Sequence, residues 1–300
     1  MATIEARALG KSYGGKPAVV DLSFDVRPGT VTGFLGPNGA GKSTTMRLML
    51  GLDRGQGSTT FDGKAFGDLR RPMRHVGALL EAKPFHPTRT ARNHLRMLAA
   101  ANGIGDRRVD EVLGQVGLSE VSKGKPKGFS LGMGQRLGLA AALLGDPHTL
   151  ILDEPANGLD PQGIQWMRVL LRGLAAEGRT VFVSSHLLSE MALMADELVV
   201  VGKGELITTG PVAELIKGSQ RNAIVVRTPE AARLAGLLTA DGGTVENEDD
   251  GLVVHGMELR RIGDLAFDNG VRLHELSART ATLEEAFLEL TAGSEEFQAR

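Results

Sequence analysis

The sequence contains no cysteine, and it has only one tryptophan and one tyrosine among 300 residues. Without cysteine the chain forms no disulfide and offers no thiolate nucleophile or thiolate metal ligand, which fits a cytosolic protein. The scarcity of aromatic rings argues against a nucleic-acid surface built on base stacking, because such a surface needs several exposed rings. A net charge of −2 supplies no basic field. The composition therefore disfavours a protein that wraps nucleic acid.

Long apolar runs are also missing. The longest nearly apolar stretch, residues 137–144, is much shorter than the roughly 20 residues that a membrane-spanning helix needs. The first ten residues carry both charges and no apolar segment of signal-peptide length. We therefore expect a chain that does not itself cross a bilayer. Its hydrophobic content of 42% is ample for a core, and its length allows one large or two modest domains.

The chain does contain a phosphate-binding loop. The pattern G-x-x-x-x-G-K-[ST] is formed by Gly36, Pro37, Asn38, Gly39, Ala40, Gly41, Lys42, Ser43 and Thr44. An apolar segment (residues 31–35) precedes the loop and a helical one (residues 45–50) follows it. Glycine lets the backbone approach closely, so that loop N–H groups and the helix N-terminus converge on phosphate oxygens. The motif predicts binding of a nucleoside triphosphate, with Lys42 on the β- and γ-phosphates and Ser43 on magnesium.

A second motif carries two acids at the end of an apolar strand. Residues 150–152 are Leu-Ile-Leu, and Asp153 and Glu154 follow them directly. Such a pair is weak evidence by itself, because an acidic surface turn has the same pattern. Together with a phosphate-binding loop it predicts that Asp153 holds Mg²⁺ and that Glu154 accepts a proton from water.

Hydrophobic periodicity predicts an α/β core in residues 1–217. Apolar residues recur at helical spacing through a subdomain at about residues 88–145. Around it we predict a hairpin in residues 1–35, strands at 57–61, 149–152 and 180–184, a helix at 161–176, and a closing hairpin at 198–201 and 205–208. Strands separated by a helix imply a largely parallel sheet.

The pattern changes at a polar stretch that begins at Lys217, and we predict a small accessory α+β domain in residues 218–300. Its expected elements are a strand at 223–227, a helix at 230–238, two short strands about the acidic turn 246–251, a helix at 258–269, a strand at 273–276 and a last helix. Thr282 and Glu285 have the spacing of a capping box at the start of that helix.

A third motif begins at Phe129 and reads Phe-Ser-Leu-Gly-Met-Gly-Gln-Arg to Arg136. Ser130 is placed to cap the Ala/Leu-rich helix that follows and to aim N–H groups at an anion. Residues 157–160 (Asn-Gly-Leu-Asp) and 184–186 (Ser-Ser-His) come later. This order of motifs resembles the ATP-binding cassette (ABC) ATPases, and among them the ATPase subunits of antibiotic and drug exporters. The resemblance extends over residues 2 to about 215 and more weakly into the tail.

The resemblance implies roles for residues around the nucleotide. Tyr13 looks like the aromatic residue that stacks on adenine, Glu154 like the general base, and His186 like the histidine that contacts the γ-phosphate. Glu81 stands where most relatives have a glutamine that binds magnesium and contacts water. It could still ligate the metal through oxygen, so it joins Ser43 and Asp153 as a candidate magnesium ligand.

Other matching residues imply a dimer. Ser130 and Gly132 match the family's signature motif, which completes the ATP site of the other subunit in a head-to-tail pair, and Asp160 matches an aspartate at the shared interface. Leu131 and Met133 replace the middle Gly and the final Gln of the usual signature. These replacements look like those of the drug-exporter branch and argue against an importer.

The resemblance implies a P-loop ATPase core with antiparallel β and helical subdomains, which binds ATP and Mg²⁺. We expect two copies of the chain on a separate membrane permease, docked near residues 81–100, at the cytoplasmic face of the cell membrane. The complex would export a drug, antibiotic or lipid-like substrate, with no nucleic acid as partner. Two alternatives stay open: a soluble ABC ATPase that acts on ribosomes or nucleic acid, and a P-loop kinase or GTPase. The Ser130 motif and His186 argue against the latter.

Overall fold

The chain divides into two compact units, residues 1–211 and residues 212–292. The computed structural model describes residues 3–80, 85–86, 88–219, 221–248 and 251–292. The division falls after Pro211, a little before the boundary expected at Lys217, which stays a prediction. The two units are described separately below.

The core of the first unit is a six-stranded sheet, in the order β5 (Val76–Leu79), β6 (Thr149–Leu152), β7 (Thr180–Ser184), β3 (Val31–Leu35), β8 (Glu197–Gly202) and β9 (Glu205–Pro211). The first five strands are parallel, and β9 closes the sheet as an antiparallel hairpin with β8. Every residue of β3, β6 and β7 is buried, as expected for strands covered on both faces. The predicted parallel core and closing hairpin are confirmed.

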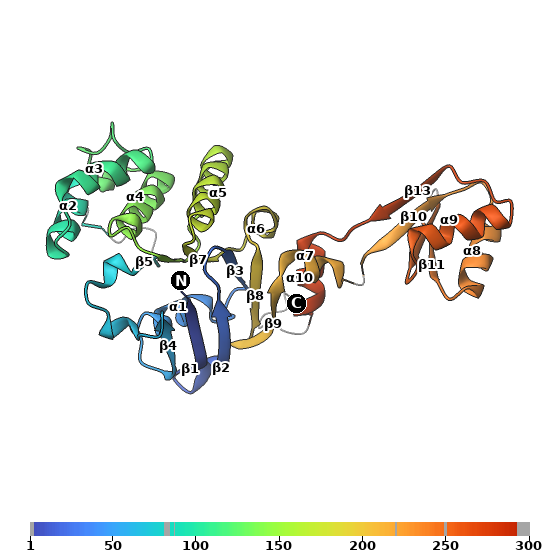
Figure 1. Ribbon diagram of the computed structural model, residues 1–300, viewed down its shortest axis with the longest axis horizontal. Helices are drawn as coiled ribbons and strands as arrows, with labels where there is room; N and C mark the ends of the chain where they lie inside the picture. The colour runs from blue at the N-terminus through green and yellow to red at the C-terminus, as the bar shows by residue number, and fades with distance from the viewer. Residues whose placement is uncertain (1–2, 81–84, 87, 220, 249–250, 293–300) are drawn as a thin grey trace. The chain divides into compact units, whose positions relative to one another are not determined.

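A three-stranded antiparallel sheet lies against this core, in the order β2 (Lys16–Val26), β1 (Ile4–Tyr13) and β4 (Gln56–Phe61) (Figure 1). The turn between β1 and β2 is formed by Gly14 and Gly15, so the predicted hairpin is confirmed. Phe24 of β2 packs against Phe34 and Phe182 of the parallel sheet, with ring centroids 5.8 and 5.4 Å apart. Offset aromatic packing of this kind stabilises a core beyond the area it buries, and here it joins the two sheets.

The helices of the first unit are α1 (Lys42–Met49), α2 (Ala91–Ala101), α3 (Asp106–Gln115), α4 (Leu131–Leu143), α5 (Pro161–Ala176) and α6 (Leu188–Met194). Short 3₁₀ turns occupy Phe66–Asp68, Pro72–Arg74 and Pro126–Gly128. Helices α2, α3 and α4 form the helical group predicted around residues 88–145 (Figure 1). The prediction that the helix after the phosphate-binding loop begins at residue 45 is wrong. It begins at Lys42, because Gly41 has a left-handed backbone (φ 93°) and the helix starts at the next residue.

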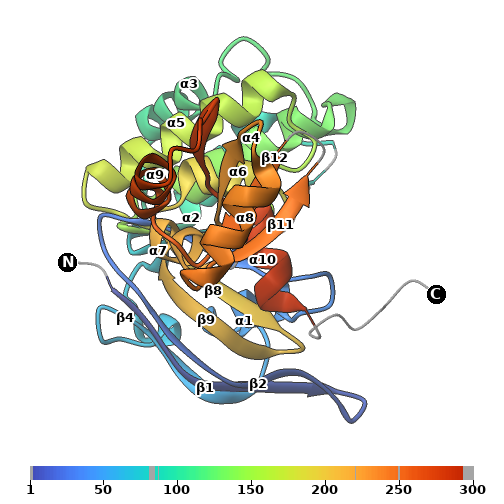
Figure 2. The same ribbon diagram turned by 90° about the vertical axis from the view of Figure 1, so that its right-hand side faces the viewer.

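The second unit contains a four-stranded antiparallel sheet, in the order β11 (Thr244–Glu248), β12 (Gly251–His255), β10 (Ala223–Arg227) and β13 (Glu275–Arg279). With α8 (Ala231–Ala240) and α9 (Leu259–Asp268) it has the β-α-β-β-α-β order of a split βαβ fold. Side chains of α8, α9 and alternate strand residues form one apolar cluster, so both helices cover the same face of the sheet (Figure 2).

Two shorter helices, α7 (Val212–Lys217) and α10 (Leu283–Thr291), pack against each other in the second unit. The predicted capping box is confirmed, because the Thr282 hydroxyl accepts from the Glu285 N–H and the Glu285 carboxylate accepts from the Thr282 N–H. The predicted last strand, residues 273–276, is placed too early. Pairing with β10 sets its bounds, since Arg227 lies opposite Glu275 at one end and Ala223 opposite Arg279 at the other.

Within the described ranges, every helix is too short or too polar to cross a membrane.

Candidate nucleotide-binding site

The phosphate-binding loop connects the end of β3 to α1 in the predicted order. Two of its glycines are required by close backbone contacts. A Cβ atom at Gly41 would lie 2.3 Å from the carbonyl oxygen of Ala18, and one at Gly36 would lie 2.5 Å from that of Val201. Any larger residue would push these backbone segments apart, so the sequence pattern also reflects a steric requirement.

Lys42 is buried at the first position of α1, and its ammonium group donates to the carbonyl oxygens of Gly36 (2.6 Å) and Pro37 (3.2 Å). Burial lowers the pKa of Lys42, while the nearby charges of Glu154 and Asp153 act in the opposite direction. The lysine and the two acids thus interact electrostatically. Residues that are far apart in the sequence meet here, as the two motifs predict.

Asp153 and Glu154 follow β6, and Ser184 ends the neighbouring strand β7. The Ser184 hydroxyl donates to Asp153 Oδ1 and accepts from the Glu154 N–H, at 2.9 Å. Because β6 and β7 are parallel, their carboxyl ends lie at the same edge of the sheet. The motifs in the sequence assign no role to Ser184. Its position two residues before His186, at the end of a predicted parallel strand, was the available indication.

Glu154 has a left-handed backbone, with φ at 48°. Few residues other than glycine adopt this conformation, and the surrounding structure must stabilise it. The Glu154 carboxylate is in contact with His186, whose Nδ1 lies 2.6 Å from Oε2 and whose backbone N–H donates to the same oxygen at 3.3 Å. The structure therefore brings the predicted base and the predicted histidine together.

Ser130 and Asp160 both cap helices. The exposed Ser130 hydroxyl accepts from the N–H of Met133 (3.2 Å) at the start of α4, as predicted, and Asp160 accepts from the N–H of Gly163 (2.8 Å) at the start of α5. Gly132 lies against the loop before α5, since a Cβ there would be 3.2 Å from the carbonyl oxygen of Gly158. In the described part of the chain, no hydrogen bond or ion pair joins these residues to Lys42.

Tyr13 ends β1 with half of its surface exposed. Its hydroxyl donates to Asp53 (3.0 Å), whose carboxylate also accepts from Arg47 of α1 (2.9 Å). The ring is thereby fixed relative to the helix that follows the phosphate-binding loop. Its stacking role stays a prediction. Glu81 lies outside the described residues.

The donors near Lys42 suit a metal that is bound mainly by oxygen. Ser43 is exposed in the first turn of α1, and Asp153 offers a carboxylate. In the part of the chain that the structure describes, no group of three or more His, Cys, Asp or Glu side chains could hold a metal ion. Zinc or calcium would need such a group, whereas Mg²⁺ uses one or two carboxylates together with phosphate oxygens and water.

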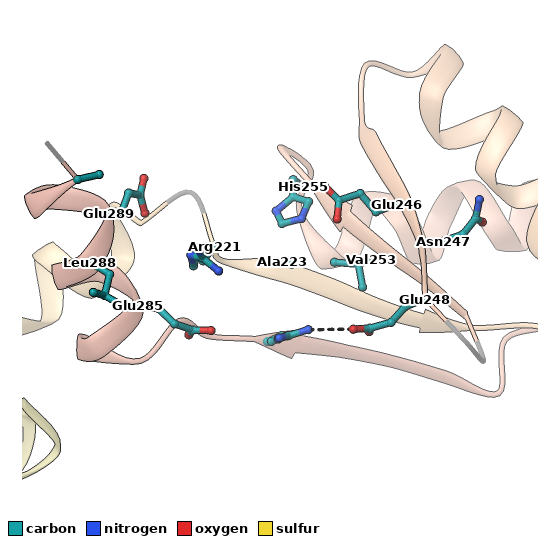
Figure 3. A pocket seen from close by; sticks show the side chains of 12 residues that line it. Arg221, Ala223, Glu246, Asn247, Glu248, Val253, His255, Glu285, Leu288 and Glu289 are labelled. Atoms are coloured by element: carbon teal, nitrogen blue, oxygen red, sulfur yellow. Dashed lines mark hydrogen bonds and ion pairs between the residues drawn. The ribbon is translucent and has the colours of Figure 1, made fainter. Parts of the chain in front are cut away.

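A cavity of about 700 Å³ lies in the second unit, between the strands and α10 (Figure 3). Its charges are mixed and largely paired within the protein. Glu248 lies 3.5 Å from Arg279, Glu289 accepts from a serine hydroxyl, and Glu285 belongs to the capping box. Neither a glycine-rich loop nor a buried lysine lines it. This cavity is therefore not the triphosphate site.

The ABC transporter family model matches residues 19–157. The chain is 38% identical over 306 residues to the uncharacterized ABC transporter ATP-binding protein YhcH of Bacillus subtilis (strain 168), covering 98% of this chain and 97% of YhcH. The chain belongs to the ABC transporter ATP-binding proteins. It is also 36% identical over 299 residues to the bacitracin transport ATP-binding protein BcrA of Bacillus licheniformis, with 97% of each chain covered.

Solved structures agree with this ABC assignment. The structure of an ATP binding subunit of an ABC transporter matches with a TM-score of 0.65 and 27% identity, covering 71% of this chain and 92% of the other. The dimeric bacterial ABC transporter cassette MJ0796 has the same fold, with a TM-score of 0.64. A second family model, for a domain of unknown function (DUF8746), matches residues 222–284, within the C-terminal unit.

The predicted family and fold class are therefore confirmed. The protein is the ATP-binding and ATP-hydrolysing subunit of an ABC transporter, and the alternatives of a ribosome- or nucleic-acid-directed ATPase and of a kinase or GTPase are set aside.

Proposed function

We propose that this ABC subunit powers the export of a drug, antibiotic or lipid-like compound through a separate membrane permease, at the cytoplasmic face of the cell membrane. Relatives aligned over most of this chain are named for bacitracin transport, in Bacillus licheniformis, and for linearmycin resistance, in Bacillus subtilis. A lantibiotic transport protein of Streptococcus pyogenes aligns with 68% of the chain. These names support an exporter, and the permease would contact the chain near residues 81–100.

One observation carries the catalytic proposal: Lys42, Asp153, Glu154 and His186 meet at one edge of the parallel sheet. Glu154 would accept a proton from the attacking water, because its carboxylate is held by His186 and its backbone by Ser184. Lys42 would turn from the loop carbonyls to the β- and γ-phosphates, whose charge its ammonium neutralises. His186 would donate to the γ-phosphate once nucleotide is present.

Ser43 and Asp153 would hold magnesium, and the oxygen donors of the site fit this ion. Bound Mg²⁺ supplies positive charge against the phosphate oxygens. The Ser184 hydroxyl orients the Asp153 carboxylate by donating to one of its oxygens. Glu81 is a further proposed ligand.

The site would be completed by a second copy of the chain, arranged head to tail. Ser130 is exposed at the N-terminus of α4, where the hydroxyl and the helix dipole favour an anion. Because no described contact joins it to Lys42 of its own chain, its proposed ligand is the nucleotide bound to the second copy. Gly132 and Asp160 would lie at the same interface.

The test is magnesium-dependent ATP hydrolysis by the full chain over a range of protein concentrations. We expect specific activity to rise with concentration and to fall in both Lys42→Ala and Ser130→Ala. Ser119→Ala is the matched control and should behave as wild type, because Ser119 is an exposed serine outside the motif that caps α4. Turnover that is independent of concentration and indifferent to Ser130 would overturn the composite site.

A further inference from the structure

Gln135 is a buried polar residue in α4 to which neither the motifs nor the proposed function assign a role. Its side chain is only 4% exposed. The side-chain NH₂ donates to the backbone carbonyl of Glu154 at 3.4 Å. The amide orientation follows from this contact, since the opposite one would set two acceptor oxygens against each other.

The other end of the same amide has no partner. Gln135 Oε1 is buried and accepts no hydrogen bond from any described residue. A buried polar atom without a partner is costly, and an apolar side chain of similar size would fill the same space without that cost. The contact with Glu154 is therefore the feature that distinguishes glutamine from methionine or leucine at this position.

The contact falls on a strained residue. Glu154 has φ at 48°, and its N–H donates to Ser184. Its carbonyl accepts from the Asn157 N–H (3.1 Å) in the following turn and from Gln135, the one partner that comes from α4. A left-handed glutamate needs such support to keep a defined orientation, because relaxation of the backbone would swing the carboxylate away.

Helix α4 also carries the signature residues. Ser130 caps it, Gly132 lies in its first turn, and Gln135 follows Gly132 by slightly less than one turn. The next residue, Arg136, stacks on Trp166 of α5 at 4.1 Å and donates to the carbonyl of Val116. One rigid helix therefore joins the surface proposed to meet the other chain's nucleotide to the backbone of this chain's own base.

We propose that Gln135 is a positioning residue that ties the backbone of Glu154 to the signature helix of the same chain, and so couples the two ATP sites of the dimer. This inference rests on the proposed head-to-tail function. When Ser130 and Gly132 engage nucleotide at one site, α4 shifts or becomes fixed. Gln135 passes that change to Glu154 at the other site.

The first experiment compares wild type with Gln135→Met, which keeps the volume and removes the donor. Leu139→Met, a buried change one turn further along α4, is the control for altered packing. We expect kcat to fall about tenfold, within the range of ordinary coupling, with the KM for ATP within about twofold of wild type. The Hill coefficient for ATP should fall from above 1 to 1. Values of kcat and Hill coefficient equal to those of Leu139→Met would overturn the inference.

A second experiment uses mixed dimers in which one chain carries Glu154→Gln, so that a single site hydrolyses ATP. Gln135→Met on the chain with intact Glu154 should give the tenfold loss, whereas on the other chain it should cost less than about twofold. A loss that is equal in the two arrangements, or larger when Gln135→Met is on the chain with Glu154→Gln, would overturn the tie to Glu154, because the signature of that chain completes the intact site.

The failure of the proposed function would look different. In that case Glu154→Gln would not form an ATP-bound dimer on sizing, with or without Gln135→Met. If the dimer forms in both backgrounds and Gln135→Met leaves turnover unchanged, the composite site stands and the positioning role of Gln135 is refuted.

Discussion

The two units of the chain both place helices on a sheet, but they distribute chemical groups differently. In the nucleotide-binding unit the central strands are parallel, so that Lys42, Asp153 and Ser184 follow strand ends at one edge. In the C-terminal unit neighbouring strands are antiparallel, and their polar residues are spread over an open face. Parallel strands concentrate residues where they all end, which is where α/β proteins bind ligands.

The units also differ in backbone strain. Among the described residues, every non-glycine with positive φ lies in the nucleotide-binding unit, and Glu154 is one of them. In the C-terminal unit the positive-φ positions are Gly242, Gly256 and Gly270, which adopt this conformation without strain. In the described ranges, left-handed non-glycine residues thus fall in the unit that contains the candidate nucleotide site, and Glu154 is the one whose side chain belongs to that site.

The largest expected effect comes from replacing Glu154, the left-handed residue of the candidate site in the nucleotide-binding unit. We expect Glu154→Gln to lower ATP turnover by about 10²- to 10⁴-fold, because the proposed base is lost while the phosphate-binding loop is intact. ATP binding should persist, and sizing with ATP and magnesium should show a trapped dimer. Glu120→Gln, at an exposed glutamate of the same unit, should leave turnover unchanged. A monomeric Glu154→Gln variant would contradict the composite site.

We expect that the C-terminal unit can be destabilised without loss of ATP turnover by the nucleotide-binding unit. Leu238 is fully buried in the C-terminal core, and Leu238→Ala should destabilise that unit by about 2–5 kcal/mol. Hydrogen exchange should rise in residues 223–279 while ATP turnover stays within about twofold of wild type. Phe267→Ala, at a side chain that is 85% exposed, should change neither quantity. A parallel loss of turnover in Leu238→Ala would show that the units depend on each other.

The smallest effect concerns Asp146, another left-handed residue of the first unit. Burial would raise the pKa of its carboxyl, but a hydrogen bond from Arg179 and the charge of Arg108 outweigh burial, so the pKa is lowered. A lowered pKa stabilises the folded state above the unfolded-state value near 3.9, and this contribution is lost as pH falls through the folded-state value.

Asp146→Asn should therefore reduce the free energy of unfolding at pH 7 by about 0.5–1 kcal/mol, a modest amount for a side chain that is mostly exposed. In urea unfolding the difference from wild type should shrink as pH falls below about 3.9 and vanish once pH is below the lowered folded-state pKa, because the carboxyl is then protonated in both states. Asp21→Asn is the control, since Asp21 also has a left-handed backbone but no ion pair among those described. A pH-independent effect would assign the loss to the turn rather than to the charge.

The sequence predicted most of the architecture because its patterns are local. Strands β3, β6 and β7 and helix α5 have the predicted bounds, since apolar runs and the Asp160 cap mark their ends. The start of β13 was missed because its bounds depend on pairing with a distant strand. Strand β5 and helix α6 were also not predicted. Both are short, and only their neighbours in space define them.

The candidate site shows the same limit. Motif spacing located Lys42, Asp153, Glu154 and His186, because phosphate chemistry requires these residue types in a fixed order along the chain. It located neither Ser184 nor Gln135, whose contacts with the Glu154 backbone depend on the folded chain. The left-handed conformation of Glu154 was equally invisible, since nothing in the residue type indicates it.

The single tryptophan of the chain makes it possible to follow α4, the helix that carries the signature residues, by intrinsic fluorescence. Trp166 of α5 lies under the guanidinium of Arg136, the residue that follows Gln135 on α4. Indole emission depends on the local field, and every other residue of the chain is silent in this spectral window apart from Tyr13. A movement of α4 relative to α5 would therefore change the fluorescence of an unlabelled protein. The stacked pair of Arg136 and Trp166 is therefore an intrinsic fluorescence probe of the contact between α4 and α5.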